Sequence, residues 1–235
     1  MKKNIHLAIA LVFALLLLSF PAYAAGKMTV GQENFHVIDS YNIYGYVFAK
    51  VENTGDKPVE FSAGLLEIYD ENGDTLTSTD YMYCYPKTLQ PGEVGYIYAS
   101  DGIDTVDSLE KVDDYMLTVT GKSGDAEIIR YPTVGDFQED VQVSKYSTYN
   151  YVIAEITNNT EETVYSMNVV IALLDDQDNI LYLAHNDFYM STGINAGSTI
   201  TYRDSISDSF YEAWEREGVK PAHVDVIAYS EVESF

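Results

Sequence analysis

Hydrophobic and polar residues alternate with a period of two along much of the chain. From Tyr44 to Val51, large side chains alternate with Gly45, Val47, Ala49 and Val51. Successive side chains of a β-strand point to opposite faces, so this pattern predicts a strand that turns its small and β-branched residues into a core. Short runs of this kind separated by turn formers are typical of an all-β protein. The predicted strands are 44–51, 59–69, 75–79, 94–99, 115–120, 126–131, 149–156, 164–174, 180–184, 198–202 and 224–229.

Turn-forming residues separate these runs. Asn53 and Asn158 each follow a strand, and Asn tolerates left-handed backbone and bonds its own main chain, so both are interpreted as turn residues. Asn-Gly within 70–74 predicts a hairpin. A further hairpin is predicted at 121–124, leading into the strand 126–131.

Two segments depart from the β pattern and predict short helices. Asp104–Val112 carries an apolar residue at every third position. In the second segment Ser209 and Glu212 have the spacing of a capping box, and Gly218 is placed to end the helix. Trp214 is predicted to pack this helix onto the β-structure, with a ligand platform as the alternative.

A shift of 105 residues places 41–100 on 146–205 without a gap, with apolar runs and turns in phase. A unit of this length is too long for a solenoid repeat, so each copy is expected to have its own core. The sequence therefore predicts two tandem immunoglobulin-like antiparallel β-sandwich domains, 25–134 and 135–235, each with one short helix and joined near 132–136. The identical positions are Tyr41, Tyr44, Tyr46, Val47, Ala49, Asn53, Val59, Asp70, Leu76, Gly92 and Ser100.

The first 24 residues have the features of a secretory signal peptide. Lys2 and Lys3 precede an apolar run, Leu7–Phe20, and Ala22–Ala24 matches a small-x-small cleavage site. The run is shorter than the roughly 20 residues that a membrane span needs. We therefore expect a secreted or extracytoplasmic protein without stable membrane insertion after cleavage, with an uncleaved anchor as the alternative.

The charge balance narrows the class of partner. The chain has 13 Lys and Arg against 37 Asp and Glu, a formal net charge of −24. Such a surface repels phosphate backbones, so nucleic acid is not expected as a partner.

Three segments resemble the FxLYD family, whose name spells Phe-x-Leu-Tyr-Asp. They are Leu66–Asp70, the preceding turn Val51–Gly55 and the downstream turn Leu89–Gly92. The second copy matches more loosely at Ile171–Asp175, and both copies have an aliphatic residue in place of Phe. The resemblance implies an immunoglobulin-like β-sandwich in exported or cell-envelope bacterial proteins, and it implies no shared catalytic residue.

The sequence motifs do not indicate a catalytic or metal-binding site. Cys84 is the only cysteine, has no neighbouring His to activate it and is expected to be a buried hydrophobe. His36, His185 and His223 lack metal-ligand spacing, so neither a metal nor a cofactor is expected. The segment 70–74 resembles the start of a calcium loop, but its twelfth position is a tyrosine, which favours a plain turn.

The most suggestive functional feature is aromatic. Tyr81, Tyr83 and Tyr85 alternate along one run, and Tyr96 and Tyr98 alternate nearby. Tyrosines on one face offer flat apolar area with a hydroxyl rim, which suits contact with a glycan or a protein. The alternative is packing under a loop or against the second copy.

The sequence therefore favours an exported, non-catalytic binding or interaction protein. A passive structural spacer is the first alternative. A carbohydrate-acting enzyme is the second, and it requires two closely spaced carboxylates in a cleft.

Overall fold

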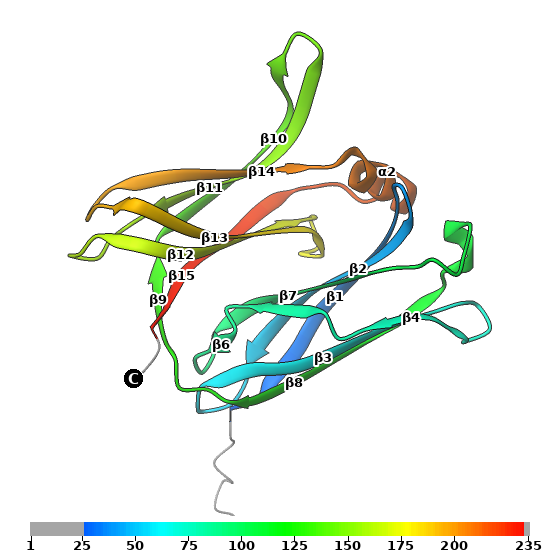
Figure 1. Ribbon diagram of the computed structural model, residues 1–235, viewed down its shortest axis with the longest axis horizontal. Helices are drawn as coiled ribbons and strands as arrows, with labels where there is room; N and C mark the ends of the chain where they lie inside the picture. The colour runs from blue at the N-terminus through cyan, green and yellow to red at the C-terminus, as the bar shows by residue number, and fades with distance from the viewer. Residues whose placement is uncertain (1–25, 233–235) are drawn as a thin grey trace, which may run out of the picture.

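The computed structural model describes residues 26–232, so the predicted signal peptide lies outside the described residues. Most of the described chain forms β-strands, and all the strand pairs are antiparallel (Figure 1). The prediction of an all-β protein is confirmed at this level. We call 26–126 the first half and 127–232 the second half, because their strands belong to different sheets.

Two sheets make up the first half. One has the strand order β1-β2-β7-β5, and the other has the order β4-β3-β6 with β8 also paired to β3. Val47, Leu66 and Ile97 are fully buried in the core between them. The strands are β1 (Met28–Asp39), β2 (Ile43–Asn53), β3 (Val59–Tyr69), β4 (Thr75–Thr79), β5 (Met82–Tyr85), β6 (Thr88–Leu89), β7 (Val94–Gly102) and β8 (Asp114–Ser123).

The second half has a three-stranded sheet, β10-β11-β14, and a four-stranded sheet, β13-β12-β15-β9. Its core includes Val152, Ile171 and Leu173, together with Trp214 from the helix α2 (Asp208–Glu217). The strands are β9 (Glu127–Tyr131), β10 (Thr133–Ser144), β11 (Ser147–Thr157), β12 (Val164–Leu174), β13 (Ile180–Ile194), β14 (Thr199–Ile206) and β15 (His223–Val232).

The predicted hairpin at 121–124 is wrong. β8 continues to Ser123, and β9 then pairs with β15 rather than with β8, placing Ala228 opposite Tyr131. The spacing of Gly121 and Gly124 is typical of a local turn. In the structure, however, β9 pairs with the edge of β15 that is not occupied by β12. The chain therefore passes to the sheets of the second half before β9, ahead of the predicted junction at 132–136.

Both predicted turn asparagines are fully buried and hold their turns by equivalent bonds. The Asn53 amide nitrogen donates to the carbonyl oxygens of Lys57 (2.7 Å) and Leu89 (2.9 Å). The Asn158 amide donates to those of Glu162 (2.8 Å) and Ile194 (2.7 Å), each 105 residues further along. A buried side-chain amide that bonds two carbonyls joins the turn to a neighbouring segment as well as closing it.

Asp70 and Asp175 are also used alike. The Asp70 carboxylate accepts from the backbone N–H groups of Asn72 and Asp74, both at 2.9 Å. Asp175 accepts from the corresponding groups of Gln177 and Asn179, both at 2.8 Å. The carboxylates thus close turns, as predicted.

The helix predictions are partly wrong. Only a single 3₁₀ turn, Leu109–Lys111, forms within 104–112, because apolar residues three apart suit this tighter winding and no side chain caps the turn. α2 begins after Ser207, so Ser209 lies inside the helix and the predicted capping box is absent. Gly218 ends α2 in the left-handed conformation, as predicted. Within residues 26–232, no helix is both long and apolar enough to cross a membrane.

The two halves pack against each other through the β1-β2-β7-β5 sheet. Phe48 and Tyr96 are fully buried in the same cluster as the second-half core. His36 of β1 is also fully buried, and its Nδ1 lies 2.8 Å from a carboxylate oxygen of Glu217 at the end of α2. The face of β2 that carries Tyr46 and Phe48 is therefore covered by the second half, while the face that carries Val47 packs in the first-half core.

Candidate functional site

The chain changes sheets between β4 and β5. β4 pairs with β3, whereas β5 crosses to the edge of the other sheet and pairs with β7, placing Tyr83 opposite Tyr98 and Tyr85 opposite Tyr96. Residues opposite each other in a ladder point to the same face, so these four tyrosines share a face of the sheet. This is the face turned toward the second half (Figure 1).

The predicted tyrosine surface is divided among three environments. Tyr81 and Tyr83 are exposed, at 74% and 50%. Tyr85 and Tyr98 are half-buried where the two halves meet. Tyr96 is fully buried, and its hydroxyl donates to the Asp225 carboxylate of β15, so it serves the packing of the two halves.

The second half supplies the facing wall. The rings of Tyr85 and His185 are stacked, with centroids 3.7 Å apart and planes inclined by 13°. Tyr83 extends the stack, with its centroid 6.0 Å from that of Tyr85 and planes inclined by 4°. Three rings from β5 and β13 thus form a column that spans the junction between the halves.

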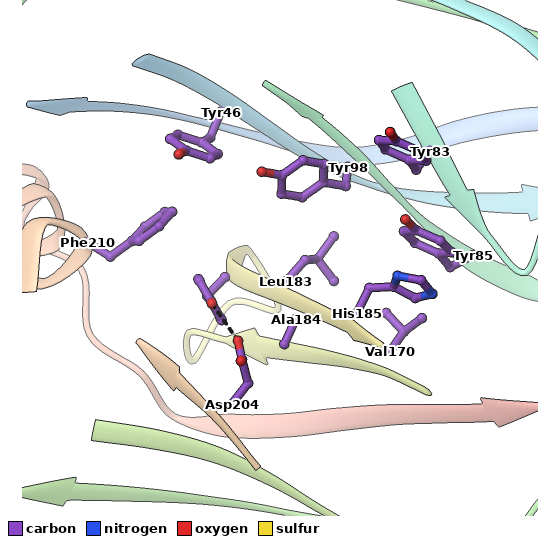
Figure 2. A pocket seen from close by; sticks show the side chains of 11 residues that line it. Tyr46, Tyr83, Tyr85, Tyr98, Val170, Leu183, Ala184, His185, Asp204 and Phe210 are labelled. Atoms are coloured by element: carbon purple, nitrogen blue, oxygen red, sulfur yellow. Dashed lines mark hydrogen bonds between the residues drawn. The ribbon is translucent and has the colours of Figure 1, made fainter. Parts of the chain in front are cut away.

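A cleft of about 340 Å³ lies on one side of this column (Figure 2). Tyr46, Tyr98, Tyr83 and Tyr85 lie on one side of it, and Phe210 of α2 closes one end. The remaining lining residues are Val170, Tyr182, Leu183, Ala184, His185 and Asp204. The volume is at the small end of the range of about 300–1,000 Å³ that is typical of ligand sites.

A second hollow, also of about 340 Å³, adjoins the column. It shares Tyr83, Tyr85 and His185 with the first cleft but has a more charged rim, with Lys87, Asp187 and Glu231. The three rings of the column therefore line both an aromatic cleft and a more charged hollow.

The first cleft has one carboxylate among its lining residues. Asp204 of β14 accepts a hydrogen bond of 2.8 Å from the Tyr182 hydroxyl. Neither Lys nor Arg lines this cleft in the described part of the chain. The arrangement lacks the pair of carboxylates that glycoside hydrolysis requires.

Three tyrosines and the histidine of the cleft favour their neutral forms. Burial raises the pKa of the Tyr46, Tyr98 and Tyr182 hydroxyls, so they remain protonated at neutral pH. Burial lowers the pKa of His185, and the nearby Asp187 carboxylate offsets this only in part. His185 is therefore a neutral imidazole at neutral pH.

Other candidate groups lie elsewhere. Cys84 is on the opposite face of β5, is 4% exposed, and has a pKa raised by burial to about 12. Among residues 26–232 no cluster of three His, Cys, Asp or Glu could hold a metal ion. His36 lies near Glu217 and His223 near Asp178, each away from the cleft.

Of the eleven residues that line the cleft, the sequence singles out three, Tyr83, Tyr85 and Tyr98. Tyr46 is one of the positions identical in both copies, and its local sequence does not distinguish it from the other strand residues. Tyr182, Asp204 and Phe210 come from β13, β14 and α2, and no local motif connects them to the tyrosines of β5. The alternation of Tyr46 and Phe48 on β2 was the available signal, because it left a second apolar face that needed a cover.

No protein-family model matches this chain, and no curated protein matches it.

Proposed function

We propose that the protein is an exported, non-catalytic binding protein whose ligand occupies the aromatic cleft between its two halves. The observation that carries this proposal is the lining of the cleft: tyrosines of β2, β5 and β7 face His185 and Phe210 across a volume of about 340 Å³. Ligand sites are typically concave and mainly apolar, with a few polar groups that orient the ligand. The tyrosine hydroxyls and Asp204 are groups of that kind.

We further propose that the two halves are tandem immunoglobulin-like domains related to the FxLYD family, made with a signal peptide and active outside the cytoplasm. The equivalent bonds of Asn53 and Asn158 support a common origin of the halves. β9 pairs with β15. We therefore place the domain boundary at the start of β9, between 126 and 127.

Tyr83 lines the cleft, Tyr81 precedes it by two residues, and both are exposed. A larger partner, either a protein or a glycan, would contact them first. We do not propose a nucleic-acid partner, because the chain has a formal net charge of −24 and would repel the phosphate backbone. The second candidate function, a passive spacer, is favoured by the burial of Tyr96 between the halves, since it shows that part of the tyrosine surface serves packing.

A binding screen separates the two functions. The secreted protein would be tested on a glycan array and against a small-molecule library, with Tyr83→Ala and Tyr98→Leu as cleft variants. Tyr189→Ala is the matched control, because Tyr189 is 79% exposed and lines neither hollow. A ligand that the control retains and the cleft variants lose supports binding at the cleft. A ligand that both cleft variants retain would place binding outside the cleft, and the absence of any ligand would favour the spacer.

A further inference from the structure

Four aromatic rings follow one another around the end of the cleft that is closed by α2. The centroids of Tyr98 and Tyr46 are 6.2 Å apart, those of Tyr46 and Phe210 are 5.1 Å apart, and those of Phe210 and Tyr182 are 5.1 Å apart. All four residues line the same cleft. Their planes are inclined by 60° to 80° to one another, so the rings enclose the space rather than stack across it.

The end of the cleft that is closed by α2 carries a negative charge, that of the Asp204 carboxylate. Asp204 is the carboxylate of the lining, and it lies against the ring of aromatic groups through its bond to the Tyr182 hydroxyl. His185 is neutral at neutral pH, since burial lowers its pKa. The chain as a whole carries a formal net charge of −24. An anionic ligand is therefore disfavoured both locally and at long range.

We propose that this end of the cleft, which we call the aromatic end, binds the quaternary ammonium group of a small organic solute. The proposal rests on the proposed function and names the ligand class of the same site. Aromatic faces attract cations that lie within about 6 Å of the ring centroid, and the attraction increases when the site excludes water. A carboxylate beside the rings adds a further favourable charge.

A quaternary ammonium group fits better than other cations. It has no N–H donors, so a site with one carboxylate and mostly ring faces leaves none of its hydrogen bonds unmade. A lysine ammonium is compact and strongly hydrated, and it would lose water ligands that the rings do not replace. Hard metal ions require several oxygen ligands, which the aromatic end does not provide.

The test compares two probes of the same shape on the full secreted chain. Choline chloride carries the charge, and 3,3-dimethylbutan-1-ol replaces its nitrogen by carbon. Titration calorimetry at pH 7.5 in about 150 mM NaCl screens nonspecific attraction to the acidic surface. We expect choline to bind at least ten-fold more tightly than the neutral alcohol, which corresponds to about 1.4 kcal/mol.

Variants assign the binding to the aromatic end. Phe210→Leu keeps apolar volume but removes a ring, and Asp204→Asn removes the charge but keeps an oxygen acceptor for Tyr182. Each is expected to weaken choline binding about ten-fold, while Tyr189→Ala leaves it unchanged.

The outcomes distinguish the two proposals. Equal binding of the two probes, or choline binding that survives both Phe210→Leu and Asp204→Asn, overturns the ammonium proposal. If choline does not bind but another ligand does and is lost in the cleft variants, the ammonium proposal fails and the proposed binding function stands. If no ligand depends on the cleft, both fail. A thermal melt of each variant confirms that it is folded, and Asp204→Asn provides the test if Phe210→Leu does not fold.

Discussion

The rings of Tyr85 and His185 lie face to face with their centroids 3.7 Å apart, although the two residues belong to different halves of the chain. Tyr85 reaches this position because β5 leaves the sheet of β4 and pairs with β7. The corresponding segment of the second half, 187–190, remains in β13 and pairs with β12. One strand crossing thus places an aromatic residue of the first half against an imidazole of the second.

The stack predicts a pH dependence of stability. Burial lowers the pKa of folded His185, partly offset by Asp187, so the unfolded chain takes up the proton first as the pH falls below about 6.5. The His185 contribution to the free energy of unfolding is therefore complete above this pH and decreases below it, until the folded pKa is passed. We expect the melting temperature of the wild type to fall more between pH 7.5 and 5.5 than that of His185→Gln.

The other ionisable groups are present in both proteins, so the difference between the two curves reports on His185. Parallel curves would show that its protonation is not linked to folding.

Tyr96 joins the halves through its bond to Asp225, so Tyr96→Phe should weaken the junction without removing the ring. Loss of a hydrogen bond to a charged group is expected to lower the free energy of unfolding by about 1.5–3 kcal/mol, measured by urea denaturation. Tyr83→Phe is the matched control, because Tyr83 is 50% exposed, and it should change the stability by less than about 0.5 kcal/mol. Equal effects of the two substitutions would argue against a structural role for the Tyr96 hydroxyl.

The buried turn asparagines should be among the most sensitive positions. Asn53→Ala leaves the carbonyls of Lys57 and Leu89 without their donor, and it is expected to cost about 2–4 kcal/mol. Asn158→Ala removes the equivalent bonds and should cost a similar amount. Thr54→Ala, at an exposed neighbour, should stay within about 0.5 kcal/mol. Denaturant titration of the three variants measures this, and a small loss at Asn53 would mean that water replaces the amide.

Cys84 should behave as an inert core residue. It is 4% exposed, and burial raises its pKa to about 12, so both access and thiolate formation are suppressed. We expect a thiol reagent such as DTNB to react slowly with the native protein at pH 8 and at the full rate in concentrated urea. Rapid labelling of the native protein would show that β5 opens at the sheet edge.

The local chemistry of the chain was sufficient to predict most strands and turns. β3 and β12 have the predicted bounds, and Gly218 ends α2. These features depend on side-chain alternation and on residues that tolerate left-handed backbone, both of which are local properties. The prediction of a helix at 104–112 was wrong because it also depended on local spacing alone. Apolar residues three apart do not distinguish a helix from a 3₁₀ turn followed by extended chain.

Only the tertiary structure decided how the tyrosines are used. Alternation places Tyr83 and Tyr85 on one face, but several sheet edges can accept a four-residue strand, and the choice of β7 depends on contacts distant in sequence. The pairing of β9 with β15 is a choice of the same kind. The sequence by itself determined that an aromatic face exists. Long-range packing decided that Tyr96 is buried, that Tyr81 and Tyr83 are exposed, and that Phe210 and Asp204 complete the cleft.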